Sequence, residues 1–126
     1  MSVIGIGTDI VEVSRLISMS SKVREKIAHR TLTPREYETY QQHPNDIAFL
    51  AKRWAGKEAV AKAIGTGIAE GVSFQHIEIV SQENGKPTLL LTEHALKVAQ
   101  QLGANHWHIS LSDEKCYAIA FAVLSV

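Results

Sequence analysis

Apolar and polar positions alternate over residues 3–13 in a pattern that predicts a β-strand. Both alternating sets are largely apolar, so the strand is expected to be buried on both faces. Residues 14–42 are more polar and helical, with Ser14 as a candidate N-cap of a short helix. Thr33-Pro-Arg-Glu36 then fits the cap and first three positions of another helix.

The longest predicted helix spans about residues 47–64. It is rich in Ala, Leu and Lys, follows a break at His43-Pro-Asn-Asp46, and ends at Gly65. The alanines Ala51, Ala55, Ala59 and Ala63 leave its surface so small that other elements can pack closely on two sides. The helix is therefore expected to be buried in the centre of the fold.

The second half of the chain predicts two hairpins separated by a helix. Residues 74–80 and 88–91 are expected to form antiparallel strands around an Asn-Gly turn. The apolar positions within 92–102 have helical spacing, and two last strands cover 105–112 and 116–126. The order of elements predicts an α+β fold with a mainly antiparallel sheet.

Length and composition agree with a single domain over residues 1–126. With 126 residues, of which 45% are hydrophobic and 21% charged, the chain is neither disordered, collagen-like nor a coiled coil. At this size roughly two-thirds of the unfolded surface can be buried.

The single cysteine, Cys116, excludes an internal disulfide and a cysteine-based metal site. Because it begins the apolar run 116–124, we expect a buried core thiol. No apolar stretch approaches the ~20 residues of a membrane span, and the N-terminus lacks the pattern of a secretion signal. These features predict a cytoplasmic protein with no membrane partner.

Asp9 lies on the side of the first strand that it shares with Gly5, Gly7 and Val11, where a lone carboxylate would be costly to bury. A positive group should therefore lie against it. The neighbouring glycines, Gly5 and Gly7, favour close approach of another element or of a ligand. One possibility is pairing with Arg or Lys, or capping of a turn. The other is a hard cation such as Mg²⁺, which commonly takes one or two carboxylates plus water and phosphate.

Trp54, Glu58 and Lys62 recur every four residues on the long helix and share one face. A solvent-exposed Glu-to-Lys pair would explain the two charges. If the helix is buried, Glu58 and Lys62 would instead line a functional site.

Two turns and two histidines allow similar alternatives. Gly65-Thr-Gly67 and Asn84-Gly-Lys-Pro87 could present N–H groups to phosphate, or could simply end a helix and connect a hairpin. His106 and His108 are expected on one face of a strand, but no third ligand at suitable spacing supports zinc.

Four segments, taken in order and spacing, resemble the small, single-domain 4′-phosphopantetheinyl transferases, the holo-[acyl-carrier-protein] synthases. They are Gly-Ile-Gly-Thr-Asp-Ile-Val-Glu at 5–12, the helix with Trp-Ala-Gly-Lys-Glu-Ala-Val-Ala-Lys within 49–67, Asn-Gly-Lys-Pro at 84–87, and His-Ile-Ser-Leu-Ser-Asp at 108–113. The resemblance implies that family's fold. It also implies Mg²⁺-dependent transfer of phosphopantetheine from coenzyme A to a serine of apo acyl carrier protein, releasing adenosine 3′,5′-bisphosphate, in fatty acid biosynthesis.

The same resemblance assigns roles to individual residues. Asp9 and Glu58 match the metal ligands, Lys62 would stabilise the leaving bisphosphate, and Glu58 would accept the serine proton directly or through a metal-bound water. Further coenzyme A contacts are Arg53, Lys62, Gly65, Thr66, Gly67, Asn84, Gly85, Lys86, Pro87 and His108. The family commonly has His where this chain has Asp113, so Asp113 is left outside the site. Small members are trimers with coenzyme A between subunits, which predicts a homotrimer.

The net charge is zero but is unevenly distributed. Residues 14–35 carry six basic side chains and one acid, so this segment is +5 and the rest of the chain is −5. Beside a coenzyme A site, Arg15, Lys22 and Arg24 are expected to dock the acidic carrier protein. Overall neutrality argues against non-specific nucleic-acid binding.

Two alternatives remain from the residues alone. Two carboxylates and a lysine would also serve a Mg²⁺-dependent phosphohydrolase. The second alternative is a non-catalytic module that binds an acidic protein. In such a module Asp9 and Glu58 would have no role.

Overall fold

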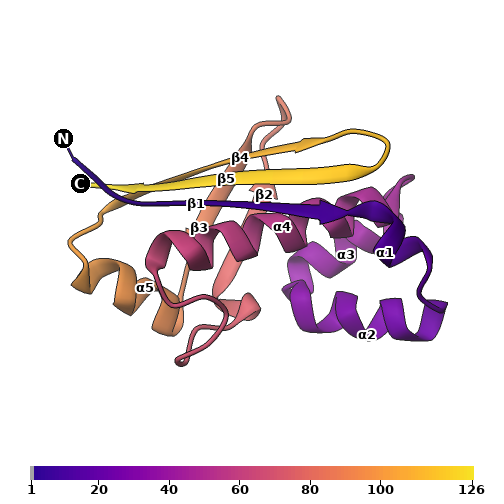
Figure 1. The fold of residues 1–126 in the computed structure, drawn as a ribbon, viewed down its shortest axis with the longest axis horizontal. Helices are drawn as coiled ribbons and strands as arrows, with labels where there is room; N and C mark the ends of the chain where they lie inside the picture. Colours follow the sequence, from indigo (N-terminus) through magenta and orange to yellow (C-terminus); the bar gives the residue numbers. More distant parts are fainter. Residues whose placement is uncertain (1) are drawn as a thin grey trace.

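Two antiparallel sheets lie along one long helix in residues 2–126, the part of the chain that the computed structural model describes (Figure 1). The larger sheet has the strand order β1 (Val3–Glu12), β5 (Tyr117–Ser125), β4 (His106–Asp113). The smaller sheet pairs β2 (Ile77–Ser81) with β3 (Pro87–Leu91). The predicted α+β class with antiparallel strands is confirmed.

The central helix, α4 (Asp46–Ile64), is the element on which the other elements pack. Its N-terminus is capped by Asn45, whose Oδ1 accepts a 3.2 Å hydrogen bond from the Ala48 N–H. It ends at Gly65, which adopts φ 96°, a left-handed conformation that glycine reaches without a Cβ clash. Most of its side chains are buried, as its small-residue composition predicts.

The glycines of β1 allow that strand to contact the backbone of α4. A Cβ on Gly7 would overlap the carbonyl oxygen of Ala59, and one on Gly5 would overlap that of Ala63. The sequence-based expectation of close approach at these glycines is confirmed. The contact also sets the position of Asp9, two residues after Gly7, along the axis of α4.

Three short helices precede α4: α1 (Val13–Ile17), α2 (Ser21–Thr31) and α3 (Pro34–Gln42). The predicted Thr33 cap is confirmed as a capping box, because the Thr33 N–H donates to Glu36 Oε1 at 2.8 Å and the Glu36 N–H donates back to Thr33 Oγ1. The predicted Ser14 cap is wrong. The N-cap of α1 is Glu12, since the strand passes directly into the helix.

The second half follows the predicted order with shifted ends. The expected strand from residue 74 begins at 77, because Phe74–His76 form a 3-10 turn (η1) capped by Ser73. The hairpin β2–β3 and the helix α5 (Glu93–Gln101) are confirmed.

Two burial predictions are wrong in the chain as described. Only the face of β1 that meets α4 is buried, whereas Ile6 and Ile10 on the opposite face are 62% and 58% exposed. Cys116 is exposed, because it precedes β5 in the turn and does not join the alternation of that strand. Within residues 2–126, every helix is too short or too polar to cross a bilayer.

An exposed apolar surface, called here the outer face, covers the side of the larger sheet that points away from α4. On β1 and β5 it is formed by Ile6, Ile10, Tyr117, Ile119 and Phe121. Polar side chains continue it on β4, among them His106 and His108.

Candidate functional site

Asp9 and Lys62 meet where β1 crosses the C-terminal part of α4. The Lys62 Nζ is 3.0 Å from Asp9 Oδ1 and donates a second hydrogen bond to the Thr8 carbonyl, also at 3.0 Å. The Asp9 side chain is 18% exposed, against 52% for Lys62. The prediction that a positive group lies against Asp9 is confirmed.

Glu58 lies one turn before Lys62 on α4 and is half-buried at the edge of a cavity of about 430 Å³. The other walls of that cavity come from α2, α4, the loop after α4 and η1. They are Arg30, Trp54, Ile68, Val72, Ser73 and Phe74. Glu58 therefore lines a partly apolar cavity and stands one helical turn before the lysine that contacts Asp9.

The predicted metal ligands Asp9 and Glu58 are carboxylates, the type of donor that suits Mg²⁺. Among residues 2–126, no group of three or more His, Cys, Asp or Glu side chains is arranged to hold a metal, as a closed structural zinc site would require. Mg²⁺ needs fewer protein ligands, because water and substrate phosphate complete its shell. Glu58 at the open cavity and Asp9 beside Lys62 have the chemistry that such a site needs.

The predicted carrier-docking residues differ in their surroundings. Arg15 on α1 is exposed, and its guanidinium lies 5.8 Å from the ring centre of Trp54, close to the Glu58 cavity. Lys22 is exposed on α2. Arg24 is half-buried and donates to the carbonyls of Leu16 and Met19 at 2.8 and 3.2 Å, so it also holds α1 against α2.

Both glycine turns are engaged in local structure. At 65–67, the N–H groups of Gly65 and Gly67 donate to carbonyls of α4, and the Thr66 hydroxyl donates to the Gly67 carbonyl. At 84–87, the Lys86 N–H donates to Asn84 Oδ1 and the turn closes the β2–β3 hairpin. The residues of each turn are exposed or half-buried, so a ligand could contact the solvent-facing side of either turn.

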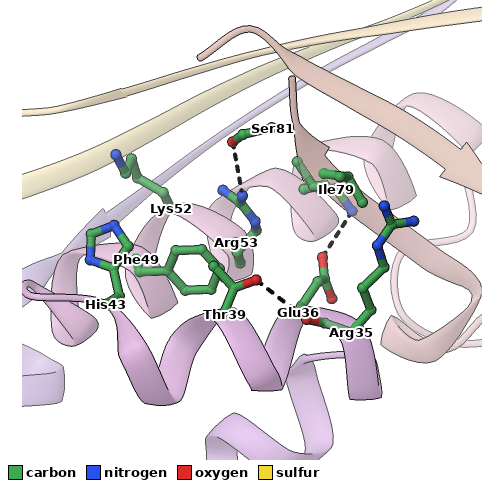
Figure 2. Close-up of a pocket in the computed structure, with 10 residues that line it drawn as sticks. Arg35, Glu36, Thr39, His43, Phe49, Lys52, Arg53, Ile79 and Ser81 are labelled. Carbon is green, nitrogen blue, oxygen red and sulfur yellow. Dashed lines mark hydrogen bonds between the residues drawn. The ribbon is translucent and has the colours of Figure 1, made fainter. Parts of the chain in front are cut away.

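Arg53 lies on a different side of α4 from Lys62. Nine residues, or about two and a half turns, separate the two side chains, which points them in opposite directions. Arg53 is 5% exposed and lines a pocket between α3, α4 and β2, called here the basic pocket (Figure 2). His108 is elsewhere again, on the outer face.

The Arg53 guanidinium is only partly satisfied in this pocket. It lies 4.4 Å from the ring centre of Phe49, and its Nη2 donates to Ser81 Oγ at 3.3 Å. Its Nε is buried without a hydrogen-bond partner among the described residues. Burial lowers the pKa of Arg53, and the carboxylate of Glu36 opposes that effect.

A buried network beneath the basic pocket was not predicted from the sequence. Lys57 Nζ donates to Glu36 Oε1 and to the carbonyls of Thr31 and Phe74, at 2.5, 2.7 and 3.1 Å. Glu36 Oε2 accepts the Ile79 N–H at 2.8 Å. Burial lowers the pKa of Lys57, while Glu36 acts in the opposite direction. A lysine among buried alanines was the one available sequence signal.

Comparisons with known proteins agree along the whole chain. Residues 5–122 match the 4′-phosphopantetheinyl transferase superfamily. The holo-[acyl-carrier-protein] synthase of Shewanella baltica (strain OS185) is 50% identical over 98% of both chains. The crystal structure of that synthase from Neisseria meningitidis has a TM-score of 0.89 at 40% identity, covering 99% of this chain and 100% of the other.

A second solved structure carries a ligand. The holo-(acyl-carrier-protein) synthase from Bacillus anthracis str. Ames, in complex with CoA (3′,5′-ADP), has a TM-score of 0.80 at 35% identity and covers 97% of this chain and 96% of its own. These relatives, all named as holo-[acyl-carrier-protein] synthases, therefore match nearly the whole length of this chain in sequence and in fold.

Proposed function

The chain belongs to the 4′-phosphopantetheinyl transferase superfamily, and from that premise we propose how its residues carry out the reaction. The enzyme transfers the phosphopantetheine arm of coenzyme A to apo acyl carrier protein, as the names of its relatives indicate. Its chemical centre is the group formed by Asp9, Glu58 and Lys62. The observation that carries this assignment is the Asp9–Lys62 contact one turn from Glu58.

The reaction breaks one P–O bond and forms another. The carrier serine Oγ attacks the phosphorus that bears the arm, and the bond from that phosphorus to the bridging oxygen breaks. The bridging oxygen leaves with adenosine 3′,5′-bisphosphate. Lys62 would stabilise the negative charge that develops on the leaving phosphate.

Asp9 and Glu58 would hold Mg²⁺. When bound there, the cation supplies Lewis acidity and charge neutralisation at the diphosphate. Glu58 is the candidate base that takes the serine proton. Its side chain lines an open cavity, through which the carrier serine could approach.

Coenzyme A is proposed to span two subunits. Arg53 and Lys62 point to opposite sides of α4, so one molecule could contact both only if each came from a different copy of the chain. A small cavity formed by Lys62 with Ile6, Gly7, Thr8 and Phe121 joins the outer face to the Asp9 site. Self-association through the outer face would therefore bring a neighbour to the site.

A homotrimer is the assembly proposed. Contiguous exposed apolar surface of this kind commonly marks an interface.

The carrier protein is expected to approach from α1 and α2, where Arg15 lies beside Trp54 and Lys22 is free to meet acidic side chains.

The proposal is tested by incubating the protein with apo acyl carrier protein, coenzyme A and Mg²⁺. The intact mass of the carrier should increase by one phosphopantetheine, adenosine 3′,5′-bisphosphate should appear in equal amount, and EDTA should stop both. An unchanged carrier mass would contradict the transfer. Cleavage of coenzyme A without a carrier would instead indicate a phosphohydrolase.

A further inference from the structure

Apart from α4 and the loop that follows it, the Glu58 cavity is walled by the end of α2 and by η1. Arg30 is the penultimate residue of α2, and Phe74 begins η1. The Arg30 guanidinium lies 5.8 Å from the ring centre of Phe74. The Gln75 Nε2 donates to the carbonyls of Arg30 and Leu32 at 3.2 and 2.7 Å. Residues 30–32 and 73–75 therefore form one unit, called here the far wall.

Lys57 joins the far wall to α4. Its Nζ donates to the carbonyl of Thr31, the last residue of α2, at 2.7 Å and to the carbonyl of Phe74 at 3.1 Å. It also donates to Glu36 Oε1 on α3. In the described part of the chain, the bonds to Thr31 and Phe74 are the hydrogen bonds that connect the far wall to α4. Lys57 directly precedes Glu58, so this connection is made beside the proposed base.

The chemistry of Lys57 indicates a role in arranging these elements. Its side chain is 0% exposed, and a buried ion pair often stabilises a fold no better than apolar side chains of similar volume. An ammonium differs from those side chains in having three N–H donors, which can bind three acceptors at once. The three acceptors of Lys57 belong to α2, α3 and η1. A single side chain thus sets the distance of three elements from α4.

We propose that Lys57 is a positioning residue for the transfer. By holding the far wall against α4, it keeps the cavity beside Glu58 in the shape that admits the carrier serine. This inference rests on the transfer proposed above. It gives Lys57 no contact with either substrate, because its ammonium is buried and all three donors have acceptors within the chain.

The test needs a variant that removes the Lys57 bonds without leaving a buried charge unpaired. Lys57→Met alone leaves the Glu36 carboxylate without its cation, so the double variant Lys57→Met/Glu36→Gln is made beside it. Glutamine is uncharged and keeps one acceptor oxygen for a backbone N–H. Leu124→Ala is the control for stability. Leu124 is 0% exposed on β5, so its truncation destabilises the core without touching the far wall.

Transfer kinetics and calorimetric titration of coenzyme A would be measured where circular dichroism shows each variant folded. In the double variant, kcat/KM for the carrier should fall about 10- to 100-fold, as expected when a reacting group is misplaced. Its Kd for coenzyme A should stay within about threefold. Its Tm should exceed that of Lys57→Met, while Leu124→Ala should lose stability and keep its kcat/KM. Carrier activity that recovers together with Tm, or equal losses for both substrates, would overturn the inference.

Trp54 provides a second readout that needs no substrate. It is half-buried in the same cavity, and Trp107, the other tryptophan of the chain, can be replaced by phenylalanine. In that background, acrylamide should quench Trp54 fluorescence more strongly in the double variant than in the unaltered protein or in Leu124→Ala, because the far wall no longer shields the ring. Unchanged quenching in the double variant would also overturn the inference.

The fluorescence readout separates this inference from the proposed function. A protein whose cavity opens on loss of Lys57 but which modifies no carrier would refute the transfer and leave the control of the cavity by Lys57 standing. A double variant that modifies the carrier at the full rate would refute the positioning role alone.

Discussion

Lys57 on α4 and Glu36 on α3 form an ion pair 2.5 Å long, with side chains that are 0% and 1% exposed. Each donor of the ammonium has an acceptor, and Glu36 also accepts the N–H groups of Thr33 and Ile79. The pair therefore ties α4 to α3 and β2 directly beside Glu58. It orients the helix that carries the proposed chemistry.

Removing one partner of this pair should destabilise the fold strongly. Lys57→Met leaves the Glu36 carboxylate buried without its cation, which typically costs about 3–5 kcal/mol. Urea unfolding monitored by circular dichroism would measure the loss. Lys22→Met, at an exposed position of α2, should change stability by less than about 0.5 kcal/mol. A comparable small change for Lys57→Met would contradict the structural role of the pair.

Loss of the Glu58 charge should abolish most of the transfer while preserving the fold. Glu58→Gln has nearly the same shape but is a poorer proton acceptor and metal ligand, so the rate should fall about 10²- to 10⁴-fold. Any increase in Tm that Mg²⁺ gives the unaltered protein should also shrink. Glu70→Gln in the exposed loop after α4 is the control. Full activity in Glu58→Gln would exclude the proposed role.

Mixing two inactive variants tests whether one site uses residues from two subunits. Arg53→Met and Lys62→Met should each be poorly active alone. When the two are refolded together at equal amounts, about a quarter of the sites in a cyclic trimer would combine an intact Arg53 with an intact Lys62. Steady-state transfer rates should recover to roughly that fraction. No recovery from mixed trimers would place both residues in one subunit's site.

Charge placed on the outer face should disrupt the assembly. Phe121 is 46% exposed on β5, and Phe121→Asp would bury a carboxylate if a second copy covered it. Light scattering after size exclusion should show the mass falling toward that of one chain. Leu90→Asp provides a matched control, since Leu90 is 52% exposed but belongs to β3 in the smaller sheet. A trimeric Phe121→Asp variant would rule out this face as the interface.

Reversing the charge of Arg15 should affect the carrier protein and not coenzyme A. Arg15→Glu would repel an acidic partner and remove the contact with Trp54, so the KM for the carrier should rise about tenfold or more at low salt. Direct titration should show unchanged coenzyme A affinity. Lys97→Glu controls for the change in net charge. Equal losses for both substrates would contradict a docking role.

The sequence predicted the elements that depend on local signals. The capping box at Thr33, the glycine stop at Gly65 and the close approach at Gly5 and Gly7 follow from side-chain geometry within a few residues, and each is confirmed. The positive partner of Asp9 was also predictable, because a carboxylate among glycines and valines needs compensation.

Long-range relationships were harder to predict. Alternation showed that both faces of β1 are apolar, but it could not show that only one of them meets this chain. Motif spacing placed Arg53 and Lys62 on one helix, and the pockets that they line follow only from what packs on either side. The role of Lys57 depends on Thr31 and Glu36, which are more than twenty residues away in the chain.

The contact of Gly5 and Gly7 with the carbonyls of α4 leaves no space for a Cβ at either position. Any other residue there would force β1 away from the helix by its own bulk. Because Asp9 belongs to the same strand, it would be carried away from Lys62 together with the backbone. Two positions without side chains thus set the separation on which the charged pair depends.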